Sequence, residues 1–157
     1  MMMMMMMMMM MMVVIVMISH KGFTWFVSRI EELHLSLNGF LSVEYAVDCA
    51  FPRVTSLHMN GNSISRWAEM ESLGKVFPGL ANLVMMDMPM CELTGERPDA
   101  NFCCLKSLNL GNTNLSSWTE LEKLKSFPCL TDVKVHGIPF LEASQDILLG
   151  RHRPITR

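Results

Sequence analysis

A single motif recurs along the chain at a nearly constant interval and limits the folds open to it. The motif is L-x-x-L-x-L-x-x-N-x-L, with other apolar residues allowed at its leucine positions. Its five copies begin at Ile30, Val54, Leu80, Leu105 and Leu130, at intervals of 24, 26, 25 and 25 residues. Repeats of this length bury their apolar side chains by stacking on neighbouring copies. The sequence therefore predicts an α/β leucine-rich-repeat solenoid of about five repeats over residues 30–150, with parallel strands on its concave face and short helices and irregular arcs on its convex face.

The stretches between the copies also match one another. Residues 62–80 and 114–130 share a tryptophan, Trp67 or Trp118, and each ends with a Phe-Pro pair before the next copy. Because the tryptophans recur at one place in the repeat, we expect both to be wedged between the convex arc and the core.

Helix signals follow the second tryptophan and the last copy of the motif. Ser117 and Glu120 have the S-x-x-E spacing of a capping box, which predicts a helix start. Glu120 and Lys123, like Glu122 and Lys125, are spaced for ion pairs on the wetter side of that helix. Residues 141–149 predict a closing helix that covers the open edge of the last repeat.

The ninth motif position predicts how the turns are held. Asn38 and Asn62 occupy it in the first two copies, where a buried amide can hydrogen-bond the turn backbone. The other copies carry Met88, Thr113 and Ile138. Their turns must therefore use other donors and acceptors.

The ends of the chain do not share the repeat. Residues 1–18 begin with twelve methionines and are interpreted as a low-complexity tract that arose from a slipped trinucleotide repeat. A membrane signal anchor is the second interpretation, because eighteen apolar residues approach the length of a spanning helix. A cleaved secretory signal is the third. Residues 19–29 stay unassigned and contain no polar cap, which predicts that earlier repeats are missing; residues 151–157 form a basic, solvated tail.

Composition excludes several classes of protein. The 157 residues fit one compact domain or a piece of a larger one. They are 50% hydrophobic and 18% charged with a net charge of −2, so the chain lacks the concentrated positive charge that nucleic acid requires. The five cysteines form an odd set without a C-x-x-C pair, which favours reduced thiols. We expect several to be buried beside motif residues, including one of Cys103 and Cys104.

Three columns of side chains are expected on the concave face, between the apolar motif positions. The columns are Glu32, Ser56, Asn82, Ser107, Asp132; then His34, His58, Val84, Asn109, Lys134; then Ser36, Asn60, Met86, Gly111, His136. This mixed polar surface suits a protein partner. The candidate binding residues taken from it are Glu32, His34, His58, Asn60, Asn82, Met86, Asn109, Lys134 and His136.

Neither a metal site nor a catalytic site is predicted. His34 and His58 should be neighbours on adjacent strands, but a metal site needs three or four converging ligands, and only Glu32 lies near them. We therefore expect surface histidines without a metal. Hydrolase and phosphate-binding motifs such as G-x-S-x-G, H-E-x-x-H and G-x-x-x-x-G-K do not occur. The sequence predicts a protein that is not an enzyme and has no cofactor.

The amino-acid sequences of two repeats resemble those of a known family. The stretches NSISRWAEMESLGKVFPGL (62–80) and NLSSWTELEKLKSFPCL (114–130) are similar to the tubulin-folding cofactor E family, and EELHLSLN (31–38) resembles its E-like members in particular. The resemblance covers residues 30 to about 150. It implies a cytoplasmic, tubulin-binding protein. E-like members join such repeats to a ubiquitin-like domain, lack a glycine-rich cytoskeleton-associated domain, and promote tubulin destabilisation and turnover; neither domain is visible in this sequence, and the family offers no catalytic residues.

These observations lead to one hypothesis and two alternatives. The hypothesis is a non-catalytic protein of the cytoplasm and cytoskeleton that binds α-tubulin, and other tubulin cofactors with it, and regulates tubulin stability, folding and microtubule organisation. The first alternative is a generic leucine-rich-repeat adaptor of the phosphatase-regulatory type. The second, a membrane-anchored receptor, requires the Met-rich tract to be translated.

Overall fold

The computed structural model describes residues 29–42, 50–93 and 101–148, with side chains described as far as residue 143. The Met-rich tract 1–18, all but the last residue of 19–29 and the basic tail 151–157 lie outside these residues. The predictions for those segments therefore stay predictions.

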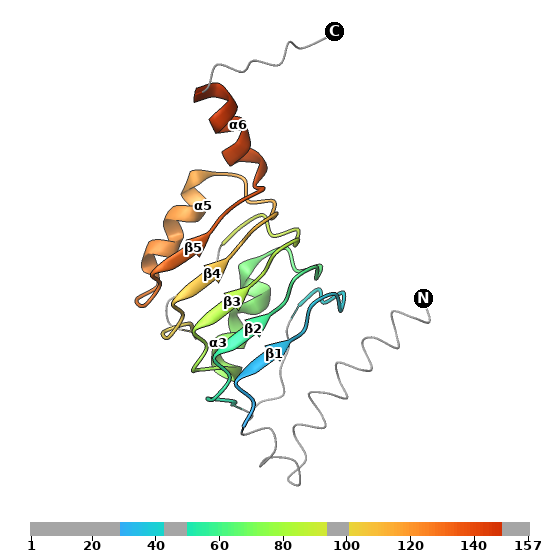
Figure 1. Ribbon diagram of the computed structural model, residues 1–157, viewed down its shortest axis with the longest axis vertical. Coiled ribbons are helices and arrows are strands. Elements are labelled where there is room, and N and C mark those ends of the chain that lie inside the picture. The colour runs from blue at the N-terminus through green and yellow to red at the C-terminus, as the bar shows by residue number, and fades with distance from the viewer. Residues whose placement is uncertain (1–28, 43–49, 94–100, 149–157) are drawn as a thin grey trace, which may run out of the picture.

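Five short parallel strands form one sheet in which the strands follow one another in chain order (Figure 1). The register aligns the central motif residue of every copy, so that Leu33, Leu57, Leu83, Leu108 and Val133 lie side by side. The strands are β1 Glu32–His34, β2 Ser56–His58, β3 Asn82–Val84, β4 Ser107–Asn109 and β5 Asp132–Lys134. The predicted α/β class and parallel strands are confirmed, and the arrangement is compatible with a repeat fold.

The core lies along one face of this sheet, where the motif side chains collect. Every motif residue of the three central copies is at most 2% exposed. Burying a leucine-sized side chain contributes about 1.5–3 kcal/mol, so this ladder is the main source of stability. The outer copies have a neighbour on one side only; accordingly Leu33 is half-buried and Val133 is 38% exposed.

The turn after each strand contains a residue with left-handed backbone geometry. Leu37, Gly61, Asp87, Asn112 and Gly137 have φ values between 55° and 66°, and each directly precedes the ninth motif position. Glycine adopts this geometry without strain, and Asn and Asp tolerate it better than most residues. The left-handed geometry at this position was not predicted from the sequence.

Asn62 holds its turn as predicted. Its Oδ1 accepts hydrogen bonds from the backbone N–H groups of Asn38 and Phe40, at 3.1 and 3.2 Å. Its Nδ2 donates to the carbonyl oxygens of Leu35 and Met59, at 3.0 and 2.7 Å. One buried amide therefore satisfies backbone groups in two adjacent copies.

The other residues at this position behave differently. Asn38 is only half-buried, and its Nδ2 donates to the carbonyl of Ser36 at 3.1 Å. Thr113 is fully buried and its hydroxyl donates to the carbonyl of Leu110 at 2.8 Å. Equivalent turns are thus held by the hydrogen bonds of an amide in one copy and of a hydroxyl in another.

Short helical segments lie across the core from the strands. They are η1 Trp67–Met70, α3 Glu71–Val76, α5 Trp118–Glu122 and η2 Lys123–Ser126. The longer α6 Pro139–Leu148 follows β5 and extends beyond the end of the sheet in Figure 1. Leu73 and Val76 of α3 join the same buried cluster as Leu57 and Leu83, so α3 covers the apolar face of the sheet. In Figure 1, α3 is seen behind the strands.

The two tryptophans have different surroundings. Trp67 is fully buried, with its ring centroid 5.2 Å from that of Phe102 and 5.5 Å from that of Phe127. Trp118 is 59% exposed and has an edge contact with Phe140, at 5.6 Å. The prediction of burial was right for Trp67 and wrong for Trp118, because the rings that cover Trp67 come from two later segments of the chain, and Trp118 lies too near the last copy to have their equivalents.

The predicted helix start is correct, but its capping box is wrong. Ser117 precedes α5 without a side-chain cap, and the Glu120 carboxylate instead accepts from Leu93 N at 2.7 Å. Both predicted ion pairs of this segment are present, and the nearer joins Glu120 to Lys123 at 2.7 Å. Glu120 thus ties α5 to the preceding segment.

Two further predictions need correction. Helix α6 occupies the predicted closing position, and Phe140 and Leu141 in its first turn pack against the core, but Val133 of β5 remains 38% exposed, so the described part of the helix covers the edge of the last repeat only in part. Cys103 and Cys104 are both exposed free thiols, as are Cys91 and Cys129. Apolar motif residues already fill the core at these places, which leaves the neighbouring thiols outside.

Candidate functional site

The face of the sheet turned away from the core carries the three predicted columns, and we call these residues the strand face. Strand pairing aligns Glu32 with Ser56, Ser56 with Asn82, and so on to Asp132. The second column, from His34 to Lys134, is aligned in the same way. This alignment follows from side-chain alternation, because residues on either side of a buried strand position point to the opposite face.

The candidate binding residues are all at least partly accessible. The exposed members are Glu32, His34, Asn82, Lys134 and His136. The half-buried members are His58, Asn60, Met86 and Asn109. The structure therefore brings together the whole predicted set on one surface.

The third column stabilises the turns as well as facing solvent. Asn60 N donates to the hydroxyl of Ser36 at 3.2 Å, and Asn60 Oδ1 accepts from Met86 N at 3.0 Å. The His136 ring lies so close to Gly111 that a Cβ on this glycine would overlap the ring. Asn60 and Gly111 thus have a structural role in addition to any role in binding.

Charges on the strand face are mixed. Glu32 lies at the first strand and Asp132 at the last, where the Ser107 hydroxyl donates to Asp132 Oδ2 at 2.8 Å. Lys134 is the one lysine or arginine in the three columns. A surface of this kind offers hydrogen bonds of both senses and lacks the cationic stripe that holds phosphates.

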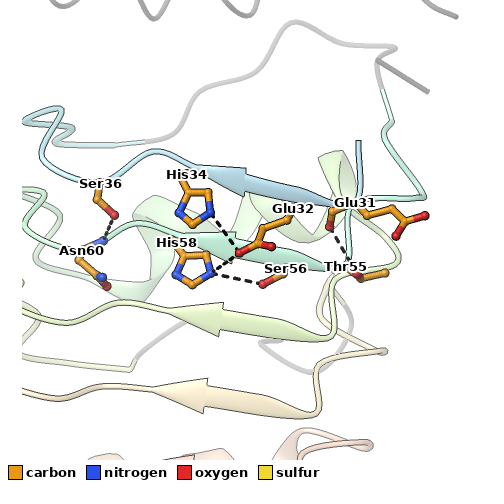
Figure 2. A network of polar contacts seen from close by, with 8 residues as sticks. All are labelled: Glu31, Glu32, His34, Ser36, Thr55, Ser56, His58 and Asn60. Atoms are coloured by element: carbon orange, nitrogen blue, oxygen red, sulfur yellow. Dashed lines mark hydrogen bonds and ion pairs between the residues drawn. The ribbon is translucent and has the colours of Figure 1, made fainter. Parts of the chain in front are cut away.

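A cluster of polar groups lies at the first two strands (Figure 2). Glu32 Oε1 is 3.1 Å from Nε2 of His34 and 3.1 Å from Nε2 of His58. The two rings are stacked, with centroids 4.4 Å apart and planes 16° from parallel. The histidines are neighbours, as predicted from the sequence, but their convergence on one carboxylate oxygen was not predicted. The E-x-H spacing of residues 32–34 beside His58 was the available signal.

The same cluster has the residue types of a Ser-His-Glu triad without its geometry. Ser56 Oγ lies 3.5 Å from His58 Nε2, the nitrogen that also faces Glu32. In a triad the nucleophile and the acid contact opposite nitrogens of the ring, so that one accepts a proton while the other is held. Both partners here compete for one nitrogen, so this arrangement cannot activate the serine.

Comparison with known proteins finds tubulin-specific chaperone cofactor E-like proteins and a tubulin-folding cofactor E among the relatives of this chain. The human tubulin-specific chaperone cofactor E-like protein is 35% identical over 117 residues, which are 72% of this chain and 27% of that protein. The chain is a homologue of the cofactor E-like proteins. The rat cofactor E-like protein is 34% identical over 115 residues, with the same two coverages, and tubulin-folding cofactor E of Arabidopsis thaliana is 31% identical over 100 residues, 62% of this chain and 18% of that protein.

The homology covers part of these proteins. The chain spans about a quarter of the length of the cofactor E-like proteins that it matches. No protein-family model matches the chain. Across the stretches described by the structure, no helix has the length and apolar character needed to cross a membrane.

Proposed function

We propose that residues 30–150 form a leucine-rich-repeat solenoid that binds tubulin without catalysis and regulates its stability, folding and organisation into microtubules. The observation that carries this proposal is the 35% identity to a protein named as a tubulin-specific chaperone cofactor E-like protein, over 72% of this chain. Such a protein would work in the cytoplasm and on the cytoskeleton. Its partners would be α-tubulin and other tubulin cofactors.

The geometry of the sheet supports a binding role. In the central copies, the motif side chains on one face of the sheet are buried in the core. The opposite face carries mainly polar side chains in regular columns. Repeat proteins commonly use such an extended, regularly spaced surface for a macromolecular partner. We propose the concave side of the solenoid, formed by the strand face, as the tubulin-binding surface.

The residues proposed for contact are those that combine exposure with hydrogen-bonding capacity. Asn82 lies on the central strand and is exposed, and Asn109 is half-buried on the neighbouring strand. Charged members lie toward the two ends of the sheet. A partner with mixed charge would therefore bind by its shape and hydrogen bonds more than by net charge.

The test compares one charge change on each side of the sheet in the full chain. Asn82→Arg places a long cation at the centre of the strand face, and Lys75→Glu changes an exposed residue of α3 on the other side. Titration of labelled αβ-tubulin should show affinity about tenfold weaker for Asn82→Arg and unchanged for Lys75→Glu.

Two outcomes would contradict the proposal. One is no tubulin binding by the unmodified chain at about 10 μM, a concentration that detects even modest affinity. The other is loss of binding in Lys75→Glu with Asn82→Arg unaffected. Binding of a phosphatase catalytic subunit in place of tubulin would favour the generic adaptor.

A further inference from the structure

The cluster of Glu32, His34 and His58 has ligand chemistry that tubulin binding does not explain. Glu32 and His34 are two residues apart on β1, so both side chains leave the same face of that strand. Strand pairing then places His58 of β2 directly opposite His34. The register of the sheet therefore places three potential metal ligands from two strands side by side on one face.

The distances are close to those that a metal ion requires. For bonds of about 2.0–2.1 Å, two ligands of a tetrahedral zinc ion lie about 3.3 Å apart. The Glu32 oxygen is 3.1 Å from each histidine Nε2, and all three ligand atoms lie within 4.8 Å of one another. The two distances between the carboxylate oxygen and the imidazole nitrogens therefore need to grow by only tenths of an ångström, and the separation of the two imidazoles is set by how their rings are turned.

The orientation of the rings requires one adjustment. A metal ion lies near the plane of each imidazole that binds it, whereas these rings are stacked nearly parallel. Both rings must therefore tilt toward the ion. The His34 side chain is 66% exposed and that of Glu32 is 56% exposed, so these two can make the larger movements, and the His58 ring, at 27% exposed, the smaller one.

The set of donors selects the kind of metal. Two imidazole nitrogens and one carboxylate oxygen suit zinc and similar transition metals, whereas calcium and magnesium prefer oxygen ligands alone. Three protein ligands leave coordination positions open to water or to a further group. The next residues of the same columns, Asn82 and Val84, bring no positive charge near the carboxylate.

We propose that Glu32, His34 and His58 form a binding site for a divalent transition metal ion such as Zn²⁺ at the first two strands of the sheet. The site is open and solvent-exposed, so its affinity is moderate, with a Kd on the order of micromolar. This proposal does not rest on tubulin binding.

The test is calorimetric titration of Zn²⁺ into the full chain with all five cysteines replaced by serine, because free thiols bind zinc strongly. We expect one ion per chain through this site. His34→Ala and His58→Ala should each weaken binding by about tenfold or more, since each removes one of three ligands, and Glu32→Gln should weaken it as well. His136→Ala is the matched control: it removes another exposed histidine of the same face, outside the cluster, and should leave the affinity within about twofold.

Circular dichroism of each variant checks that it remains folded, as expected for changes at these accessible side chains. Histidine ring resonances give a second measurement, in which Zn²⁺ should shift signals that disappear in His34→Ala and His58→Ala. Absence of binding at about 100 μM Zn²⁺, or equal affinity in the His34→Ala/His58→Ala double variant and its parent, would overturn the proposal.

Discussion

Glu120 shows how one side chain joins neighbouring copies of the repeat. Its carboxylate accepts a 2.7 Å hydrogen bond from Leu93 N and lies 2.7 and 2.8 Å from Lys123 Nζ, while only 14% of the side chain is exposed. Partial burial acts to raise the pKa of Glu120, but the bonds from Lys123 and Leu93 outweigh it and hold the pKa below the ordinary value of 4.5. The charged carboxylate is thus stabilised by the folded structure.

Glu120→Gln is expected to lower the free energy of unfolding by about 2 kcal/mol at pH 7, because it weakens two charge-assisted hydrogen bonds. A carboxyl whose pKa is lower in the folded state adds stability above its unfolded pKa, and that stability is lost as the pH falls. The difference in the free energy of unfolding between the variant and the unmodified chain should therefore shrink as the pH falls below 4.5 and through the lower pKa of the folded state. Urea denaturation at pH 7 and near pH 3 measures it.

Glu122→Gln provides the control for this prediction. Glu122 belongs to the same helix and pairs with Lys125, but its side chain is 64% exposed. Exposed pairs of this kind contribute little, so the variant should change stability by less than about 0.5 kcal/mol at either pH. An equal loss of unfolding free energy in both variants would show that the contacts of Glu120 stabilise the fold no more than those of Glu122.

Among the elements, the turns after the strands were the least visible in the sequence. The left-handed position is occupied by Leu37, Gly61, Asp87, Asn112 and Gly137 in successive copies. Leu37 takes this geometry at φ 60° although it is 77% exposed and gains little from burial. The first turn is therefore strained where the second, with glycine, is not.

Substitutions at these two turns should have opposite effects. Gly61→Ala places a Cβ in left-handed geometry and against Leu37 Cδ2, and should lower the free energy of unfolding by about 1–2 kcal/mol or more. Leu37→Gly removes backbone strain from the folded state but also raises the chain entropy of the unfolded state, which offsets part of the benefit. The free energy of unfolding should rise by about 0.5 kcal/mol. Because Leu37→Gly also frees the space beside residue 61, the double variant should lose less than the sum of the single effects. Denaturation of all four proteins gives this cycle, and single effects that simply add in the double variant would contradict the prediction.

The apolar motif predicted the strands and most of the core because it reports burial directly. Its spacing fixes which side chains face inward, and Leu57, Leu83 and Leu108 are buried accordingly. It could not predict that Trp118 is exposed, because that depends on how many later segments supply covering rings. The left-handed turns escaped notice because leucine, glycine, aspartate and asparagine share no pattern of hydropathy.

For the candidate site, the sequence predicted which face carries the residues but not how their side chains contact one another. Side-chain alternation alone placed the three columns on one face. It did not predict that Glu32 turns to bring one oxygen to both histidines, because alternation fixes the face from which a side chain leaves and not its rotamer. Nor did it predict that the Glu120 carboxylate accepts a hydrogen bond from Leu93 N instead of capping the start of its own helix, since that bond joins residues 27 positions apart in the sequence.

At the scale of the whole molecule, the sheet divides the chain into a side that stabilises it and a side that is open to a partner. The central copies have neighbours on both sides and exclude water from their motif residues, whereas the first and last copies do not. The open side runs across all five strands in register (Figure 1). A partner that spans several copies would contact many weakly interacting groups at once.

Amide hydrogen exchange of the full chain, with and without αβ-tubulin, tests the proposed binding surface most directly. The account predicts that tubulin slows exchange in residues 32–37, 56–61, 82–87, 107–112 and 132–137, which form the strands and the turns that follow them. Exchange in α3 and α5, across the core, should stay the same. Slower exchange confined to α3 and α5, or no change anywhere at saturating tubulin, would contradict it.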